Sequence, residues 1–245
     1  MGVFRFKKFE VVNELSAMKV NTDGVLLGAA MTILPSDRRL LDVGTGTGTI
    51  ALMSAQRLSS LTEDSSIVID AVDIDKVSAE EAGANFANSP WKDMLHVYNA
   101  ALDGFSDDLA SDVRYDLIFS NPPYFEDSLL APEERRCNAR HTSTGLSYRE
   151  LLEFASERLT INGRMAIVLP AEQEAPLCRY SRMCGLHLFR IMRIKTVPRK
   201  APSRIVAEFR RERCPEPEEV SLTIQNEGKY SEEYLSLTHD FYLFA

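Results

Sequence analysis

The sequence predicts an α/β fold with a seven-stranded, mostly parallel sheet and helices on both of its faces. Short apolar segments typical of buried strands alternate with segments of helical periodicity, and a glycine-rich turn follows the first of these strands. Right-handed crossovers follow from the chirality of the chain. At 245 residues, 44% of them hydrophobic, the chain can bury one such core without a second domain.

Strands and helices alternate along most of the chain. We predict strands at residues 40–43, 67–72, 95–98, 115–119 and 164–169, and helices at residues 50–56, 76–88, 148–159 and 171–184. Two further strands, 187–195 and 204–210, are joined by residues 197–202, which are too few for a helix, so we expect antiparallel pairing there. A strand-like segment at 220–224 has no predicted place in the sheet. Residues 1–36 are expected to form an N-terminal lid or substrate-facing segment, and residues 37–245 a single globular unit.

Composition excludes several classes of protein. The formal net charge of -8 argues against a protein that coats nucleic acid by summed charge alone. No signal sequence and no run of about 18 apolar residues is visible, so we expect a soluble, cytoplasmic protein without a membrane partner. The four cysteines form no CxxC pair and share no ligand spacing with the four histidines, so we expect free thiols and no metal site.

One segment departs from the acidic character of the chain. Between His187 and Arg213 the basic residues greatly outnumber the acidic ones, which are only Glu208 and Glu212. This segment is either a basic surface for a polyanion or an ordinary solvated surface of strands and loops.

A glycine-rich loop follows the predicted strand at 40–43 and begins a helix. Glycines there allow a tight turn and let a ligand approach main-chain atoms. A dinucleotide fingerprint, GxGxxG, would place its third glycine at Thr49, so the spacing argues against that cofactor. The pattern DxGxGxG is similar to that of class I methyltransferases, and a tight turn without a ligand is the alternative. The resemblance implies S-adenosylmethionine as cofactor, bound by Asp42, Gly44, Thr45, Gly46 and Gly48.

Acidic residues follow the predicted strand at 67–72. Asp73 lies at the usual distance downstream of the glycines for an acid that binds ribose hydroxyls, and Ile74 could cover one face of an adenine ring. Asp75 could also contribute, although a helix cap is favoured for it. Class I methyltransferases often carry an acid after the third strand. The corresponding position here is Ala101, with Asp103 as the nearest substitute.

A second motif, Asn121-Pro122-Pro123-Tyr124, follows the predicted strand at 115–119 and should lie at the same edge of the sheet as the glycines. The prolines fix the backbone and lack N–H groups, so their carbonyls remain as acceptors. The Asn121 side-chain oxygen and the Pro122 carbonyl can each accept one hydrogen of a planar amine, and Tyr124 can stack on its ring. A rigid turn is the alternative for this tetrapeptide in isolation. After the glycine loop it predicts methyl transfer to an amide-like nitrogen, with all four residues catalytic and Asn121 also contacting the cofactor.

Segments around these two motifs carry a closer resemblance. They are Phe4–Phe9, Met18–Gly28, Ala139–His141 and Asp240–Leu243, together with Phe125 after Tyr124. With them, nearly the whole chain resembles the bacterial tRNA adenine-N6 methyltransferases that modify adenine 37 of a valine tRNA. The resemblance implies a class I fold, S-adenosylmethionine as cofactor and N6-methyladenosine as product. We expect tRNA as partner, and neither DNA nor a stable protein partner.

The remaining candidates would contact the cofactor or the RNA. Thr22 and Asp23 could form a lid over the cofactor, or one of them could cap a helix. Arg135 and its neighbours after the catalytic turn could contact phosphate or base, or pair at the surface with Glu133 and Glu134. The expected substrate-binding residues are Lys7, Lys8, Lys19, Phe125, Arg136, Arg140, His141, Arg199 and Lys200.

Three alternative functions remain open at this level. The same tetrapeptide serves glutamine methylation on release factors, whose enzymes usually carry an additional N-terminal helical domain that residues 1–36 are too few to form. It also serves guanine-N2 methylation on ribosomal RNA, where Phe is more frequent at the position of Tyr124. A cofactor-binding RNA chaperone without turnover is the third alternative.

Overall fold

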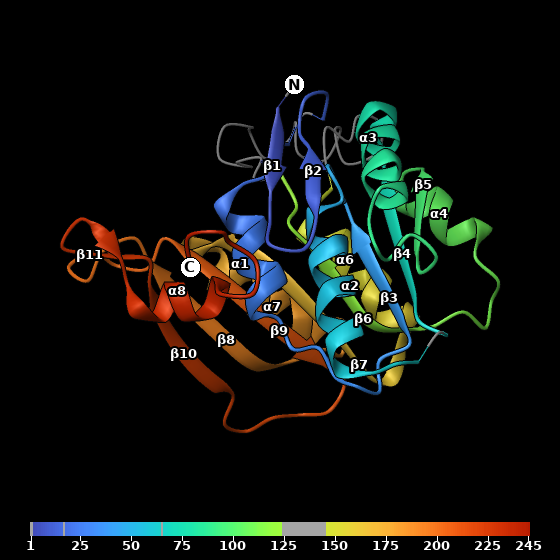
Figure 1. The fold of residues 1–245 in the computed structure, drawn as a ribbon. Helices are drawn as coiled ribbons and strands as arrows, with labels where there is room; N and C mark the ends of the chain where they lie inside the picture. Colours follow the sequence, from blue (N-terminus) through green and yellow to red (C-terminus); the bar gives the residue numbers. More distant parts are fainter. Residues whose placement is uncertain (1, 17, 65, 124–145) are drawn as a thin grey trace, which may run out of the picture.

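The computed structural model describes residues 2–16, 18–64, 66–123 and 146–245, and an eight-stranded sheet lies at its centre (Figure 1). Its strands are β3 (Arg39–Val43), β4 (Val68–Asp73), β5 (Leu95–Asn99), β6 (Tyr115–Ser120), β7 (Leu159–Pro170), β8 (His187–Lys195), β9 (Arg204–Arg210) and β10 (Glu218–Thr223). Their order is β10-β8-β9-β7-β6-β3-β4-β5. Neighbouring strands are parallel except in the two pairs that include β9. The predicted fold class is therefore confirmed, as is the antiparallel pairing of the segments 187–195 and 204–210.

The sheet has one strand more than the seven that were predicted. β10 pairs in parallel with β8, from Glu218 opposite Arg190 to Thr223 opposite Lys195. Only Leu222 among its residues is fully buried, so the apolar signal of this strand is weak. The segment forms a strand by pairing with β8, which is distant in sequence. The local sequence pattern therefore could not predict its position in the sheet.

Helices cover both faces of the sheet and divide the core into two layers. One layer contains α1 (Thr22–Ala30), α2 (Thr49–Leu61) and α3 (Lys76–Ala87), and the other contains α4 (Leu102–Asp108), α6 (Tyr148–Arg158) and α7 (Glu174–Met183). Along β7, Ala166 and Val168 face the first layer, while Met165 and Ile167 face the second. This alternation buries the central strands on both sides, as expected for parallel strands between helices. Within the described ranges, no helix combines the length and apolar character needed to span a bilayer.

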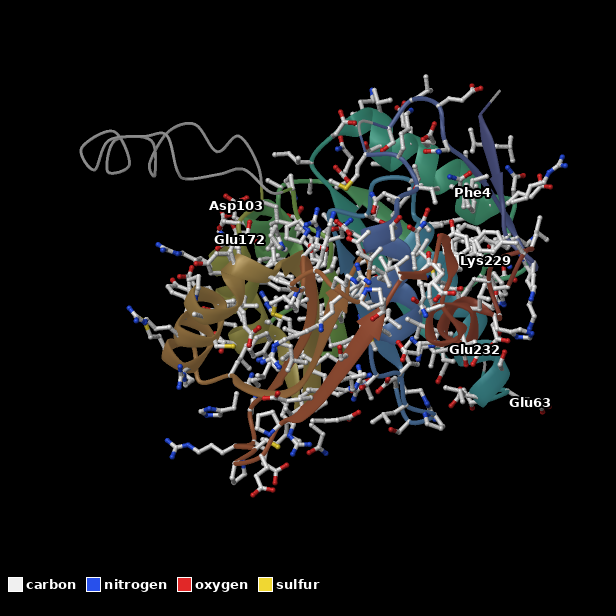
Figure 2. All side chains as sticks on the ribbon, turned by 90° about the vertical axis from the view of Figure 1, so that its left-hand side faces the viewer. Phe4, Glu63, Asp103, Glu172, Lys229 and Glu232 are labelled. Carbon is white, nitrogen blue, oxygen red and sulfur yellow. The ribbon has the colours of Figure 1, made fainter. Side chains whose placement is uncertain are left out.

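The N-terminal hairpin packs against the C-terminal end of the chain. The smaller elements are β1 (Val3–Arg5), β2 (Glu10–Val12), η2 (Ala171–Gln173), β11 (Gln225–Asn226), β12 (Lys229–Tyr230) and α8 (Glu232–Thr238). The rings of Phe4 and Phe6 each lie 6.0 Å from the ring of Tyr242, and Phe4 is labelled in Figure 2. The Lys7 ammonium donates to the main-chain carbonyl of Ala245 at 2.9 Å. Aromatic packing and this hydrogen bond together fix the N-terminal hairpin to the last residues.

Charged side chains fix the C-terminal end of α1. Arg57 donates to the carbonyl of Gly28 and Arg190 to that of Ala30, each at 2.9 Å. Arg190 also pairs at 2.7 Å with Glu208, whose side chain is fully buried. Cations at this end of a helix satisfy its last carbonyls and oppose its dipole. The position of α1 over the sheet is thus set by specific polar contacts as well as by apolar packing.

Candidate active site

The carboxyl ends of β3, β4 and β6 meet at one edge of the sheet, which we call the carboxyl edge. In the register of these strands, Val43 lies opposite Val72 on one side and opposite Ser120 on the other. The glycine loop (residues 44–48) and Asn121 therefore leave the sheet side by side. Ligands of doubly wound sheets bind at this kind of edge.

The glycine loop has a backbone conformation that disfavours residues with a side chain. Gly44, Gly46 and Gly48 have φ angles of +71°, +56° and +79°, in the left-handed region that favours glycine. The turn closes through a 2.9 Å hydrogen bond from the Gly48 N–H to the Thr45 carbonyl. A Cβ added at Gly48 would lie only 2.4 Å from a ring carbon of Phe86. The tight strand-to-helix turn predicted from the sequence is present.

Asp42 lies fully buried beneath this loop. Its Oδ2 accepts a 2.8 Å hydrogen bond from the Thr45 hydroxyl, whereas its Oδ1 has no hydrogen-bond partner among the described residues. Burial raises the pKa of Asp42 from its ordinary value of 3.8 to about 7, although the hydrogen bond from Thr45 and the nearby backbone N–H of Ala51 act in the opposite direction. The negative charge of Asp73 raises this pKa further. A buried carboxylate oxygen without a partner is suited to a ligand that brings a donor or a positive charge.

The raised pKa of Asp42 predicts a dependence of stability on pH. Because the folded protein holds this proton more tightly than the unfolded chain, its stability should fall as pH rises from about 4 to about 7. We expect Asp42→Asn, which stays neutral, to lack this component, so that the free energy of unfolding of the wild type declines relative to the variant by up to about 1.4 kcal/mol per pH unit. Urea denaturation of both proteins between pH 4.5 and 8 measures the difference. Two parallel stability curves would contradict the role of Asp42.

Asp73 is at the end of β4, beside the glycine loop. Its Oδ2 accepts from the Gly46 N–H at 2.8 Å and its Oδ1 from the Asp75 N–H at 2.9 Å, and burial raises its pKa. The neighbouring Ile74 has 66% of its surface exposed, although it is a large apolar residue. Asp75 accepts from the Ser78 N–H at 2.9 Å as the N-cap of α3, so the favoured interpretation of Asp75 as a helix cap is confirmed.

The segment after β5 has no acidic residue at position 101, where class I methyltransferases often carry one. Ala101 precedes α4 as its N-cap without a side-chain hydrogen bond, and Asp103 is exposed in the first turn (Figure 2). Asn99 instead donates to the main-chain carbonyls of Asp73 and Ile74, at 3.0 Å each. Sequence reasoning passed over Asn99, which fixes the backbone that carries Asp73.

The Asn121-Pro122-Pro123-Tyr124 motif begins directly after β6. The Asn121 side chain is 6% exposed, Pro122 is buried and Pro123 is partly buried. The Asn121 Nδ2 lies 3.5 Å from the Asn21 Oδ1 and 3.6 Å from the Met18 sulfur. Two of the predicted residues, Tyr124 and Phe125, lie outside the described residues.

A segment that we call the N-terminal strap (residues 13–16 and 18–21) crosses the glycine loop. The Ser16 hydroxyl and the Met18 carbonyl lie 3.6 and 3.5 Å from the position that a Cβ on Gly46 would take. The Glu81 carboxylate on α3 accepts hydrogen bonds from three successive N–H groups of the strap, those of residues 14, 15 and 16. Asn85, one helical turn later, bonds both β2 and the Thr47 carbonyl. The sequence signal for these two residues was a polar pair at helical spacing on a buried face.

The proposed lid residues take specific positions around α1. The N-cap of this helix is Asn21, so the suggestion of a cap at Thr22 or Asp23 was wrong. Thr22 is exposed, and Asp23 forms a 2.9 Å ion pair with Arg204. The Lys19 ammonium donates to the main-chain carbonyl of Glu14.

Salt bridges neutralise much of the basic segment between residues 187 and 213. Arg190 pairs with Glu208, and Arg193 pairs with Glu174 and Glu219. These charges are therefore balanced by acids, several of them from other parts of the chain. Four other predicted contacts and a neighbouring arginine lie outside the described residues: Phe125, Arg136, Arg140, His141 and Arg135.

All of the cations predicted to contact RNA that lie among the described residues are exposed: Lys7, Lys8, Lys19, Arg199 and Lys200. Arg199 and Lys200 lie exposed in the turn between β8 and β9, and β8 ends at the carboxyl edge because it runs parallel to β7. Lys8 is exposed in the N-terminal hairpin. Among the residues that the structure describes, no group of three or more His, Cys, Asp or Glu side chains is arranged to hold a metal ion.

A doubly wound sheet whose central strand β3 ends in this glycine loop is the class I methyltransferase fold, and the protein is an S-adenosylmethionine-dependent methyltransferase of that class. The unpartnered Asp42 oxygen, the left-handed glycines and the Asp73 carboxylate fit that cofactor, which carries an ammonium group, a sulfonium and ribose hydroxyls. The chain belongs to the methyltransferase small domain family, whose sequence profile matches residues 15–180, and within it to the relatives named tRNA1(Val) (adenine(37)-N6)-methyltransferase. The resemblance drawn from the sequence is confirmed.

Two of these relatives match nearly their whole length. The protein from Parabacteroides distasonis is 42% identical over 98% of this chain and 97% of its own length. The protein from Flavobacterium psychrophilum is 37% identical over 98% of this chain and 99% of its own length.

Solved structures confirm the fold. A protein described as a predicted O-methyltransferase from Agrobacterium tumefaciens superimposes with a TM-score of 0.63 at 16% identity, covering 89% of this chain and 96% of its own. A methyltransferase from Pyrococcus furiosus gives a TM-score of 0.56 at 19% identity, covering 82% and 89% of the two chains.

Proposed function

We propose that the protein transfers the methyl group of S-adenosylmethionine to N6 of adenine 37 in a valine tRNA. The observation that carries the proposal is the position of Asn121, beside the glycine loop at the carboxyl edge and under the N-terminal strap. The names of full-length relatives at 37–42% identity support the same substrate. In the reaction the sulfur–methyl bond breaks, the nitrogen–carbon bond forms, and N6 loses one proton to solvent.

The cofactor would be held by the glycine loop and by residues close to it. The loop offers main-chain atoms to its adenosyl and methionine parts, Asp73 accepts hydrogen bonds from ribose hydroxyls, and Ile74 covers the adenine. Asp42 offers its unpartnered oxygen to the positively charged end. Thr22, Asp23 and Asn121 complete the predicted contacts. S-adenosylmethionine supplies an electrophilic methyl group on a positively charged sulfur.

Methyl transfer to the adenine amine depends more on hydrogen-bond acceptors than on a general base. Its lone pair is delocalised into the ring, and the amine attacks only when its N–H bonds are turned out of plane. The Asn121 oxygen and the Pro122 carbonyl accept these two hydrogens, and Tyr124 with Phe125 stacks on the base. Catalysis is then chiefly alignment of nitrogen, methyl and sulfur, worth at most about 7–11 kcal/mol. The base must be unstacked to reach the site, which is least costly in a loop such as the anticodon loop.

The remaining predicted regions take complementary roles in this proposal. Residues 1–36 act as lid and substrate-facing segment, and residues 37–245 form the methyltransferase domain. Lys7, Lys8 and Lys19 contact RNA together with Arg136, Arg140 and His141. A tRNA substrate places the reaction in the cytoplasm, with no DNA and no stable protein partner required.

Charge reversal in the turn between β8 and β9 should weaken RNA binding. We expect Arg199→Glu with Lys200→Glu to lower the affinity for valine tRNA about tenfold or more at low salt and to flatten its dependence on salt, because two phosphate contacts would be lost. Filter binding over a series of KCl concentrations measures both effects. The matched control is Arg182→Glu with Arg213→Glu. It changes the net charge by the same amount, but near the C-terminal ends of α7 and β9, away from the turn that carries Arg199 and Lys200. Equal losses in the two double variants would move the RNA surface away from Arg199 and Lys200.

Modification mapping tests the proposed function directly. Valine tRNA from a strain lacking the gene should lose N6-methyladenosine at position 37 and regain it when the wild-type protein, but not Asn121→Ala, is supplied. Nucleoside mass spectrometry of the purified tRNA provides the measurement. Unchanged modification would contradict the proposed substrate. A loss of N2-methylguanosine in ribosomal RNA or of methylglutamine in a release factor would identify one of the alternatives instead.

A further inference from the structure

We propose that Asn21 is a positioning residue that fixes which way the Asn121 amide faces, so that its oxygen points toward the adenine amine. This inference rests on the proposed function. It adds a residue that does not itself touch the substrate.

The orientation of the Asn21 side chain is determined at both ends. Its Nδ2 donates to the Lys19 carbonyl at 2.9 Å, and its Oδ1 accepts from the Gly24 N–H at 2.8 Å as the N-cap of α1. Neither main-chain partner can exchange the role of donor or acceptor. The Asn21 oxygen is therefore held on the side that faces Asn121.

The Asn121 amide meets two acceptors at one of its ends. The Asn21 oxygen lies 3.5 Å from its Nδ2, and the Met18 sulfur, a weak acceptor, lies 3.6 Å from it. A rotated amide would place the Asn121 oxygen against both of them, which is unfavourable for a residue that is only 6% exposed. The Asn121 Nδ2 therefore faces Asn21, and the Asn121 oxygen lies at the opposite end of the amide.

This orientation matters because an amine substrate brings only donors. An NH2 group turned toward N6 would repel it, while an oxygen accepts one of its hydrogens. The order of contacts runs from the first turn of α1 through Asn21 to Asn121. The ion pair of Asp23 with Arg204 at one end of α1, and the contacts of Arg57 and Arg190 at the other, hold that helix in place.

Two substitutions separate orientation from helix capping. Asn21→Ser keeps a good N-cap but is too short to reach Asn121, whereas Asn21→Asp keeps both the cap and the acceptor. We expect Asn21→Ser to lower kcat for valine tRNA about tenfold with KM for the cofactor and the melting temperature little changed, and Asn21→Asp to stay within about threefold of the wild type. An unchanged kcat in Asn21→Ser, or equal losses in both variants, would overturn the proposal.

A second background tests whether the effect passes through the Asn121 amide. Asn121→Asp has two equivalent oxygens, so the direction of its side chain no longer matters. Adding Asn21→Ser to Asn121→Asp should cause no further loss of kcat, while the same additional loss as in the wild type would overturn the proposal.

The orientation of the Asn121 amide can also be tested without measuring catalysis. Nuclear magnetic resonance of the free protein labelled with nitrogen-15 should show the side-chain NH2 signal of Asn121, identified by its absence in Asn121→Asp, shifting in Asn21→Ser but little in Asn21→Asp. An Asn121 signal that is insensitive to both changes contradicts the inference. Failure of the wild type to methylate valine tRNA would instead contradict the proposed function.

Discussion

Replacing Asn121 with alanine is expected to lower the rate of methyl transfer to valine tRNA by about 100-fold or more, a loss typical of removing one preorganised polar group from an active site. The side chain is buried at the carboxyl edge, where water cannot replace its oxygen as acceptor for the amine. Because the glycine loop, Asp42 and Asp73 remain, the affinity for S-adenosylmethionine should fall only severalfold. Single-turnover methylation with excess enzyme, combined with calorimetric titration of the cofactor, separates the two effects.

Two further variants make this result specific. Asn121→Asp restores an acceptor and should recover part of the lost rate. Asn88→Ala, the same change at an exposed position after α3, should behave like the wild type. If Asn121→Ala retains most of the wild-type rate, the amine is held by other groups and the proposed mechanism is wrong.

Replacing Gly48 with alanine is expected to destabilise the protein by about 2–5 kcal/mol. The left-handed backbone at this position costs about 1–2 kcal/mol for a residue with a Cβ. The added carbon would also lie 2.4 Å from the ring of Phe86, and such overpacking costs about 1–3 kcal/mol. Since Gly48 is the N-cap of α2 and the last residue of the glycine loop, the shift of the loop should also weaken cofactor binding.

Gly185 provides the matched control for this substitution. Its φ of +72° is close to the +79° of Gly48, but a Cβ there meets nothing within 4 Å. Gly185→Ala should therefore lose only the backbone component, about 1–2 kcal/mol. Denaturant unfolding of the two variants measures the difference. Equal losses at the two positions would show that the contact with Phe86 contributes nothing.

The order of strands and helices could be predicted because its signals are local. The apolar segments of β3, β4 and β6 are each followed by residues whose chemistry suits the end of a strand, namely the glycines, Asp73 and Asn121. Parallel topology then brings these three ends together without further information. The cofactor side of the site therefore follows from short stretches of sequence.

The N-terminal strap could not be predicted, because its position depends on contacts between distant residues. Glu81 binds main-chain groups 65 to 67 positions earlier in the sequence, and Asn21 meets Asn121 across 100 positions. The helical spacing of polar residues marks positions such as Glu81, but nothing local shows which distant groups they bind. These contacts determine which atoms surround the glycine loop.

The surface charge of the basic segment, residues 187–213, could not be predicted from sequence either. Counting residues between 187 and 213 suggests a strongly cationic surface. Most of its acidic partners, including Asp23, Glu174 and Glu219, lie outside that segment in sequence and reach it only in the fold. Sequence could therefore identify Arg199 and Lys200 as candidates but could not exclude their neighbours.

The eighth strand, β10, bears on the tendency of the protein to aggregate. It is the last strand of the sheet, and an open strand edge is a template on which other chains can add. Here the edge carries Glu218 and Glu219, whose side chains are 63% and 62% exposed while they pair with Arg190 and Arg193. A strand from another molecule would have to strip water from these carboxylates as it docked, at a cost in free energy. The exposed carboxylates of Glu218 and Glu219 therefore oppose the addition of strands from other molecules at this edge of the sheet.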